Sequence, residues 1–311
     1  MNAQAVILHR PGQIGLETLT LDAPTPADAV VAIRWSGIST GTERLLWSGR
    51  MPDFPGMGYP LVPGYESVGE VVEAGAESGL RAGQAVFVPG ARCFGPVRGL
   101  FGGAASHLVS AGARLVPIDS GLAERGTLIA LAATAHHALA GVDLARPLLV
   151  VGHGVLGRLV ARIATALGGD PQVWETVPVR RQGARGYAVR APEDDARRDY
   201  ATILDVSGDA GILDAAIARL APGGEIVLAG FYEARLAFDF APAFLREARI
   251  RVAAQWRPED LAATLALIEA DRLALDGLIT HRRPADAAPD AYRTAFGDAE
   301  CLKMILDWRA A

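Results

Sequence analysis

The clearest chemical pattern in the sequence is a set of glycines that follows a short apolar segment. Leu148–Val151 is followed by Gly152, Gly154 and Gly157, and apolar residues then recur at helical spacing as far as Leu167. In a strand–turn–helix unit, the first glycine permits a tight turn, the second lets the backbone approach a pyrophosphate, and the third lets helix and strand pack closely. Free N–H groups at the start of the helix attract the anion. The pattern predicts a dinucleotide-binding site, with a purely structural glycine turn as the alternative.

A carboxylate occupies the place where such a site contacts the ribose. Glu175 lies 23 residues after Gly152, at the expected end of the next strand. There it would accept hydrogen bonds from the ribose hydroxyls and repel a 2′-phosphate, which favours NAD over NADP. Arg180 and Arg181 follow, and they would favour NADP if they fold back; alternatively they cap or solvate a short helix. The cofactor-binding residues predicted on this segment are Gly152, His153, Gly154, Val155, Leu156, Gly157 and Glu175.

Other residues near these strand ends are expected to contribute. His153 could contact the pyrophosphate, and chance exposure at the surface is the alternative. Ser207 and Phe231 follow the ends of later strands. Because the carboxyl ends of parallel strands meet at one edge of a sheet, both are expected to line the nicotinamide side.

Apolar strands alternate with helical segments through this part of the chain. Strands are expected at 148–151, 172–174, 187–189, 202–206, 225–229 and 250–253. Helices are expected at 124–139, 156–167, 212–220 and 258–270. This alternation predicts an α/β domain with a doubly wound parallel sheet, covered by helices on both faces.

The first 120 residues differ, with short apolar runs between turns rich in glycine and proline. Strands are expected at 4–8, 29–33, 67–74, 84–88 and 106–109, and a helix at 42–47. Such spacing predicts a small barrel or sandwich. The last segment, with a polar helix near 284–296 and a strand at 302–308, is expected to return to this domain. We therefore expect one domain of residues 1–120 completed by 276–311, and a second of residues 121–275.

Composition limits the possible partners and location. The 311 residues are 50% hydrophobic and carry a net charge of −5, so no basic stripe is available to bind nucleic acid. The stretch from Arg180 to Arg198 is interrupted by acidic residues and is interpreted as a solvated surface. With two cysteines, no signal-like start and no long apolar run, the protein is expected to be soluble and cytoplasmic. It would have no integral membrane segment, although an apolar substrate could bring it to a membrane surface.

Motifs along nearly the whole chain resemble, in the right order, those of the medium-chain dehydrogenase/reductase family. The matching segments are WSGIS at 35–39, PGYE at 63–66, GGAASHLV at 102–109, AHHAL at 135–139 and LITH at 278–281. The resemblance implies a GroES-like β-barrel domain and a Rossmann domain, and an oxidoreductase activity.

The positions that carry zinc ligands in that family differ here. Catalytic zinc requires three protein ligands and an open fourth position. Ser39, Tyr65 and Ala130 stand at the matching places, and only the neighbouring Glu66 is retained. The cysteine-rich lobe that binds structural zinc is absent, because Cys93 stands alone. The comparison predicts no metal site.

A closer resemblance is carried by the runs at 39–50, 56–67, 98–103 and 302–308. They look like a zinc-free branch of the family that oxidises the 3-(1-hydroxyethyl) group of a magnesium bacteriochlorin to 3-acetyl with NAD, in bacteriochlorophyll biosynthesis. The resemblance implies that substrate, and the family implies a homodimer through the edges of the Rossmann sheet. A zinc-free NADPH-dependent quinone or enone reductase is one alternative, and a non-catalytic dinucleotide-binding sensor is another.

Without a metal, the proton of the alcohol needs a side chain or a water relay. The resemblance places Tyr65 and Glu66 in the turn that faces the nicotinamide, so either could polarise or deprotonate the alcohol. A buried Glu with a raised pKa suits a general base. The alternatives are that Glu66 pairs with a cation at the domain interface and that the Tyr65 hydroxyl donates to a backbone carbonyl.

The resemblance assigns further roles. Ser39 and Thr42 lie in the loop that supplies a proton-relay hydroxyl in relatives, although such hydroxyls often cap the next helix. His137 could shuttle protons near the cofactor or be a core histidine. Lys303 stands where the family often sets a cation against the pyrophosphate, and an ordinary edge-strand lysine is the alternative.

A bacteriochlorin is a broad apolar plate and needs a wide hydrophobic pocket. Apolar side chains in loops of the first domain are candidates for that surface, with the core or a dimer contact as the alternative. They are Trp47, Met51, Phe54, Met57, Tyr59, Phe94, Leu100 and Phe101.

Overall fold

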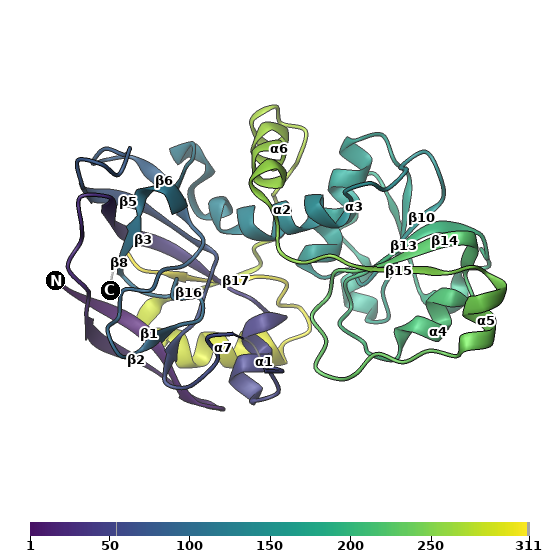
Figure 1. The fold of residues 1–311 in the computed structure, drawn as a ribbon, viewed down its shortest axis with the longest axis horizontal. Helices are drawn as coiled ribbons and strands as arrows, with labels where there is room; N and C mark the ends of the chain where they lie inside the picture. The colour runs from purple at the N-terminus through teal and green to yellow at the C-terminus, as the bar shows by residue number, and fades with distance from the viewer. Residues whose placement is uncertain (54, 310–311) are drawn as a thin grey trace. The chain divides into compact units, whose positions relative to one another are not determined.

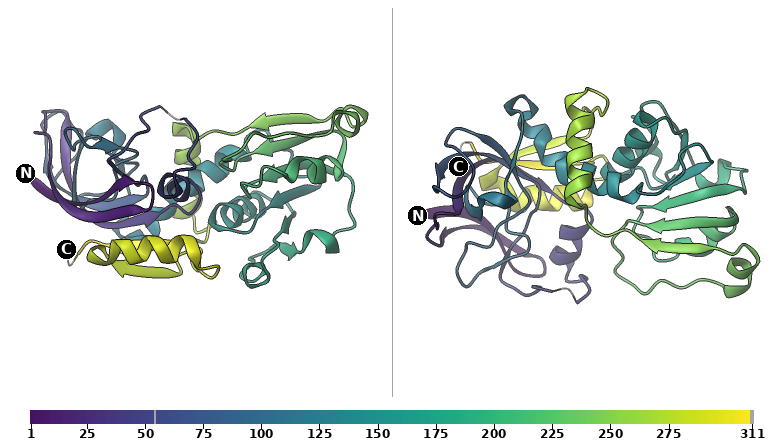
Figure 2. Two further views of the ribbon diagram at one scale, coloured as in Figure 1. Left: turned by 90° about the horizontal axis from the view of Figure 1, so that it is seen from below. Right: turned by 45° about the horizontal axis from the view of Figure 1, so that its top comes forward.

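The computed structural model describes residues 1–53 and 55–309, which form two compact units (Figures 1 and 2). Unit 1 comprises Met1–Ala130 and Leu278–Ala311, and unit 2 comprises Leu131–Gly277. The first division lies ten residues beyond the boundary expected after residue 120. The reason is that the 3-10 helix η2 (Ser120–Leu128) packs against strands β3 (Asp28–Ile38) and β5 (Ser67–Ala74) of unit 1.

Unit 2 is built on a parallel sheet with the strand order β12-β11-β10-β13-β14-β15. The strands, in chain order, are β10 (Leu148–Val151), β11 (Pro171–Trp174), β12 (Ala188–Arg190), β13 (Tyr200–Asp205), β14 (Leu220–Leu228) and β15 (Arg249–Val252). The chain moves outward from β10 in one direction and then in the other, so the switch point lies between β10 and β13. Every residue of β10 and β13 is buried, as expected where helices cover both faces of a parallel sheet. The predicted Rossmann fold is confirmed.

The following helices belong wholly or partly to unit 2. They are α2 (Ile129–Ala138), α3 (Val155–Ala166), α4 (Ile212–Ile217), α5 (Phe240–Leu245) and α6 (Pro258–Glu269). In Figure 1, α3 packs against β10 and β11, and α4 packs against β14. The helix expected at 124–139 is α-helical only in α2: residues 124–128 belong to the 3-10 helix η2. The sequence analysis missed α5.

Unit 1 contains two sheets. The larger has the order β16-β17-β3-β5-β6-β9, with β8 pairing β3, and the smaller has the order β2-β1-β4-β7. Their remaining strands are β1 (Asn2–Arg10), β2 (Gln13–Thr20), β4 (Leu61–Val62), β6 (Ala85–Val88), β7 (Arg98–Gly99), β8 (His107–Ala111), β9 (Val116–Pro117), β16 (His281–Pro284) and β17 (Met304–Asp307). The sequence analysis missed β2, whose side chains are nearly all exposed or half-buried and lack a clean alternation, and also the two-residue strands.

The C-terminal segment returns to unit 1 because β17 pairs antiparallel with β3. It also brings α7 (Ala288–Gly297) beside α1 (Thr42–Ser48), as Figures 1 and 2 show. Tyr292 on α7 donates a hydrogen bond to the Glu43 carboxylate on α1, at 2.7 Å. The rings of Phe296 and Trp47 join the same two helices, with centroids 5.7 Å apart.

Candidate active site

The glycine loop of unit 2 has the geometry that a pyrophosphate needs. Gly152 has φ 103°, a conformation that side chains rarely adopt, and a Cβ on Gly157 would lie 1.9 Å from the Gly152 carbonyl oxygen. Gly154 faces open space, with nothing within 4 Å of where its Cβ would be. Since Gly154 is the N-cap of α3, the first N–H groups of this helix have no partner within it. The loop therefore fits a dinucleotide.

Glu175 follows β11 and ties this strand to the loop. Its Oε2 accepts a hydrogen bond from the His153 backbone N–H at 3.1 Å, and its Oε1 accepts one from the Val177 N–H at 2.7 Å. The guanidinium of Arg181 donates to the Glu175 backbone carbonyl at 2.8 Å. The carboxylate thus lies beside the glycine loop, where sequence analysis expected it, and its contact with a ribose remains a prediction.

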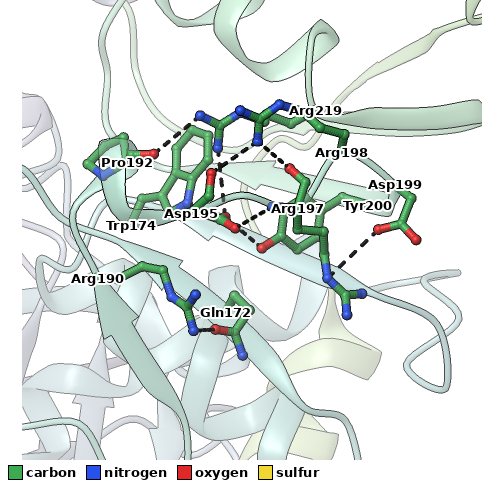
Figure 3. Close-up of polar contacts among 10 residues, drawn as sticks. All are labelled: Gln172, Trp174, Arg190, Pro192, Asp195, Arg197, Arg198, Asp199, Tyr200 and Arg219. Atoms are coloured by element: carbon green, nitrogen blue, oxygen red, sulfur yellow. Dashed lines mark hydrogen bonds and ion pairs between the residues drawn. The ribbon is translucent and has the colours of Figure 1, made fainter.

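A buried polar cluster holds the end of β11 in place (Figure 3). The Asp195 Oδ2 accepts hydrogen bonds from the Trp174 indole N–H and the Tyr200 hydroxyl, each at 2.7 Å. The Arg219 guanidinium lies 4.7 Å from the centroid of the Trp174 ring. Burial raises the pKa of Asp195, but these hydrogen bonds outweigh it and hold the pKa below its usual value. Because Trp174 directly precedes Glu175, the cluster fixes the strand end that carries the Glu175 carboxylate.

This cluster corrects one expectation. The stretch from Arg180 to Arg198 is not simply a solvated surface, because Asp195 within it is buried. In the sequence, Asp195 is one acidic residue among charged neighbours. Nothing there indicated that it would accept hydrogen bonds from two buried side chains, Trp174 and Tyr200.

The His153 side chain is fully buried, so the expectation of chance surface exposure is wrong. Its Nδ1 lies 2.6 Å from the Arg180 carbonyl oxygen, and its Nε2 lies 2.8 Å from the Tyr187 hydroxyl. Burial lowers the pKa of His153 to about 4, so the ring is neutral. Both ring nitrogens have protein partners, which leaves the backbone of this residue for any contact with a pyrophosphate.

Ser207 lies against the glycine loop, since a Cβ on Gly152 would be 3.2 Å from its Cα. Its hydroxyl donates to the Asp205 carboxylate at 2.6 Å, and the Tyr232 hydroxyl donates to the same carboxylate at 2.6 Å. Burial raises the pKa of Asp205. Phe231 is partly exposed. Their predicted contact with the nicotinamide is untested.

His137 forms part of a histidine–carboxylate cluster on unit 2. Its Nδ1 lies 2.8 Å from Asp260 Oδ2, and the Nδ1 of His136 lies 3.0 Å from Asp260 Oδ1. Burial raises the pKa of Asp260, but hydrogen bonds from both histidines and from the Arg257 N–H lower it overall. Sequence reasoning missed Asp260, although its place in the first turn of α6 marks it as a helix-capping acid.

In unit 1, hydroxyl groups stand at two of the positions that match zinc ligands in the family that the sequence resembles, Ser39 and Tyr65. The Ser39 Oγ lies 2.6 Å from the Tyr65 hydroxyl, and the Thr42 Oγ1 lies 3.5 Å from it. Neither alternative from the sequence holds: α1 has Gly41 at its N-cap without a side-chain cap, and the Tyr65 hydroxyl lies against the hydroxyls of Ser39 and Thr42 rather than a backbone carbonyl. We call Ser39, Thr42 and Tyr65 the hydroxyl chain. Two neutral hydroxyls hydrogen-bonded to each other do not fit a zinc site.

Glu66 and Lys303 form a buried ion pair beside the hydroxyl chain. They are 0% and 1% exposed, and the Lys303 Nζ lies 2.5 Å from the Glu66 Oε2. The ammonium also donates to the Ile38 carbonyl at 3.2 Å. Gly37 makes room for the pair, because a Cβ there would lie 2.3 Å from the Glu66 Oε2. Burial raises the pKa of the Glu66 carboxyl, and the neighbouring ammonium opposes this.

The pair gives both residues a partner. Glu66 meets a cation, as one interpretation of the sequence proposed, but that cation is Lys303, which belongs to unit 1 as Glu66 does. Lys303 was expected against the pyrophosphate, but its ammonium is committed to Glu66 and Ile38. Among the described residues, the other carboxylate oxygen of Glu66, Oε1, has no hydrogen-bond partner.

Sequence reasoning missed Glu43, a second buried carboxyl group at this site. It accepts hydrogen bonds from the Ser39 N–H at 3.1 Å and from the Tyr292 hydroxyl at 2.7 Å. Burial raises the pKa of Glu43 to about 7. Its position one residue inside a helix gave no signal, because its partner Tyr292 is 249 residues away in the chain.

The apolar residues expected around a substrate divide into two groups. Phe94 and Leu100 are buried core residues, which corrects the expectation for them, and Phe54 lies outside the described residues. The others are half-buried and pack against a small core cluster: Trp47, Met51, Met57, Tyr59 and Phe101.

Among the described residues, no group of three or more His, Cys, Asp or Glu side chains is arranged to hold a metal ion. None of the helices in that part of the chain is both long enough and apolar enough to cross a membrane.

The fold and the glycine loop define a dehydrogenase of the GroES-like and Rossmann type. Residues 25–120 match the alcohol dehydrogenase GroES-like domain. A protein of Cereibacter sphaeroides named 2-desacetyl-2-hydroxyethyl bacteriochlorophyllide A dehydrogenase is 58% identical, and the match covers 100% of this chain and 99% of that one. A protein of the same name from Rhodobacter capsulatus is also 58% identical, over 100% of both chains. The chain belongs to the medium-chain dehydrogenase/reductase family.

The fold also matches solved structures. An alcohol dehydrogenase from Escherichia coli CFT073, complexed with the cofactor NADH, superposes with a TM-score of 0.83. The match covers 99% of each chain at 18% sequence identity. At that identity the likeness concerns the fold.

Proposed function

We propose that the protein oxidises the hydroxyethyl group of a magnesium bacteriochlorophyllide to an acetyl group, with NAD as the oxidant. The observation that carries this proposal is the 58% identity, over the whole chain, to two proteins named for that substrate. The aligned region includes both the glycine loop and the hydroxyl chain, so the proposal covers cofactor and alcohol together.

Unit 2 supplies the dinucleotide site of this reaction. The first amides of α3 bind the pyrophosphate, and the open side of Gly154 lets the backbone approach it. When bound, NAD accepts a hydride from the carbinol carbon. The Glu175 carboxylate disfavours a 2′-phosphate, so NAD is preferred over NADP. Measuring kcat/KM with each cofactor tests this preference, and Glu175→Ser should move it toward NADP.

Unit 1 supplies the groups that remove the alcohol proton. Burial and the nearby Glu66 raise the pKa of Tyr65, so its phenol stays protonated at neutral pH. Tyr65 therefore passes a proton on instead of storing it: its oxygen accepts the proton of the alcohol, its own proton moves to the Ser39 oxygen, and the Ser39 proton leaves through water to the base. The unpartnered Oε1 of Glu66 makes this carboxylate the candidate base. Glu66→Gln should lower kcat much more than NAD affinity.

No step of the proposed reaction uses zinc. The hydroxyls of Ser39 and Tyr65 are hydrogen-bonded to each other, and Glu66 is paired with Lys303. Metal analysis of the purified protein tests this directly. Stoichiometric zinc whose removal abolishes activity would contradict the proposal.

A homodimer through β15 is part of the same proposal. This edge strand and the preceding α5 expose several apolar side chains, including Phe240 at 72%, Phe244 at 66% and Val252 at 75%. An unpaired strand edge with apolar neighbours favours pairing with a second copy. Val252→Asp should shift the molar mass measured by light scattering from dimer to monomer.

The decisive assay mixes protein, NAD and the hydroxyethyl substrate and follows absorbance. Conjugation of the new carbonyl with the macrocycle should shift its long-wavelength band to the red as NADH forms. NADPH-dependent reduction of quinones without that shift would support a reductase instead. Dinucleotide binding with neither reaction would support a sensor.

A further inference from the structure

Residues 176–187 directly follow Glu175 and have little apolar burial to hold them. Their regular structure is a single turn of 3-10 helix, η3 (Pro178–Arg181), and each of these residues is exposed or half-buried. Ordering a chain segment costs conformational entropy, which the burial of apolar side chains usually offsets. In segment 176–187, hydrogen bonds from the glycine loop and from α3 take that role.

Arg158 on α3 reaches this segment with a buried guanidinium. The residue is 4% exposed. Its Nη2 donates to the Arg180 carbonyl at 3.0 Å and to the Gln182 carbonyl at 2.7 Å. Its Nε donates to the His153 carbonyl at 3.1 Å. One guanidinium thus joins the glycine loop to the segment that follows β11.

The imidazole of His153 strengthens the same connection. Its Nδ1 lies 2.6 Å from the Arg180 carbonyl oxygen, and because a carbonyl only accepts, Nδ1 carries the proton. Since the ring is neutral, its Nε2 accepts from the Tyr187 hydroxyl at 2.8 Å. The Arg180 carbonyl therefore accepts from two buried side chains, those of His153 and Arg158.

Gly183 lets the segment approach the guanidinium. It has φ 80°, and a Cβ there would lie 2.3 Å from the Arg158 Nη1. Arg181 holds the beginning of the segment, because its guanidinium donates to the Glu175 carbonyl at 2.8 Å and to the Thr176 carbonyl at 3.0 Å. All of these cations bind backbone carbonyls, so they fix the path of the chain and not the side chains along it.

We propose that Arg158 is a positioning residue for the dinucleotide: by binding the carbonyls of segment 176–187, it holds the chain beside Glu175 in the conformation that receives the adenosine ribose. The inference rests on the part of the proposed function that concerns the dinucleotide, and the identity of the alcohol does not enter it. A segment that is ordered before binding loses less conformational freedom when the ligand arrives, which raises affinity. Loss of Arg158 should therefore weaken the dinucleotide without slowing hydride transfer.

The first test measures binding of ADP-ribose by calorimetry. This probe keeps the adenosine, pyrophosphate and second ribose of NAD but lacks the nicotinamide, so no reaction enters the measurement. Arg158→Met keeps an unbranched side chain and removes the guanidinium, and it should raise the Kd for ADP-ribose about tenfold. In turnover, its KM for NAD should rise by the same factor while kcat stays within about twofold.

Arg246→Met is the matched control. Arg246 also donates to backbone carbonyls of unit 2, those of Ala218 and Leu220. Leu220 is the first residue of β14, whereas a dinucleotide binds at the carboxyl ends of the strands. The variant removes the same kind of contact at the other end of the sheet and should leave the Kd for ADP-ribose unchanged.

Gly183→Ala tests the contact from the side of the segment and leaves Arg158 in place. The added methyl group should displace the exposed segment from the buried guanidinium, so the Kd for ADP-ribose should rise severalfold. Gly141→Ala is its control, because Gly141 is also exposed and has φ 77°, but nothing lies within 4 Å of where its Cβ would be. Equal affinities of the two alanine variants would count against the proposal.

Release of the segment is measured by limited digestion with trypsin, for which Arg180, Arg181 and Arg185 supply cleavage sites. Mass spectrometry should show severalfold faster cleavage within 176–187 in Arg158→Met than in wild-type protein or Arg246→Met, and ADP-ribose should slow it. Cleavage at the wild-type rate would mean that Arg158 does not hold the segment, and it would overturn the proposal.

The ADP-ribose titration also separates this inference from the proposed function. An unchanged Kd in Arg158→Met would overturn the positioning role, and so would a tenfold loss that Arg246→Met shares. A loss confined to Arg158→Met, with no oxidation of the hydroxyethyl substrate by wild-type protein, would instead keep the positioning role and refute the proposed function.

Discussion

The glycine loop of unit 2 and the hydroxyl chain of unit 1 are built in opposite ways. The loop is a local object: Gly152 to Gly157 span six consecutive residues, and its binding groups are backbone amides. The hydroxyl chain and its ion pair join Ser39, Tyr65 and Lys303, which are brought together only by the folded sheet. A site made of backbone amides tolerates changes of nearby side chains but not volume added at its glycines. A buried side-chain cluster instead depends on the charge of each of its members.

The largest effect is expected from added volume in the loop. Gly157→Ala would place a Cβ 1.9 Å from the Gly152 carbonyl oxygen, a backbone atom that cannot move without opening the turn. We expect loss of NAD binding together with a lower melting temperature, measured by calorimetry and thermal unfolding. Gly154→Ala is the matched control, since its Cβ meets no protein atom within 4 Å. It should weaken NAD while leaving the melting temperature unchanged; equal destabilisation by both variants would contradict this view of the loop.

This contrast explains what the sequence could predict. The loop, β10 and α3 were expected at nearly their observed positions, because glycine spacing and apolar periodicity are local signals. The Glu66–Lys303 pair spans 237 residues and the Tyr292–Glu43 hydrogen bond spans 249, so no spacing rule links them. The resemblance identified Lys303 as a functional cation but gave it a different partner. Two-residue strands such as β4 were missed for a related reason, because only the neighbouring strands define them.

The next largest effect is expected from removing one charge of the buried Glu66–Lys303 pair in unit 1. Lys303→Met leaves the Glu66 carboxylate buried without its counter-ion, which should lower the free energy of unfolding by about 3–5 kcal/mol. The double variant Lys303→Met with Glu66→Gln removes the uncompensated charge and should recover much of that loss. Denaturant unfolding of the set measures both. If the double variant is as unstable as Lys303→Met, packing of the lysine rather than its charge dominates.

Glu43 should make the free energy of unfolding of the protein depend on pH. Its folded pKa of about 7 lies above the ordinary value of 4.5, so the folded state binds the proton more tightly than the unfolded state. The stability contributed by protonated Glu43 is fully present below about pH 4.5. It is lost as pH rises through 7, which lowers the free energy of unfolding by at most about 3 kcal/mol. Glu43→Gln should flatten this slope and be more stable than wild type at pH 8. A variant with an unchanged slope between pH 4.5 and 8 would assign the dependence to another group.

The smallest effect is the removal of one hydroxyl from the hydroxyl chain. Tyr65→Phe keeps the edge-on ring contact with Phe101 but removes the partner of the Ser39 hydroxyl. Because a positioned proton-transfer group contributes about 10²-fold or more, kcat should fall by about that factor, with NAD affinity and stability unchanged. Ser39→Ala should cost less alone and add little in the Tyr65→Phe background, since both act on one proton path. Additive losses in kcat would mean separate roles, and a Tyr65→Phe enzyme within twofold of wild type would mean that the alcohol proton reaches Glu66 through water without passing Tyr65.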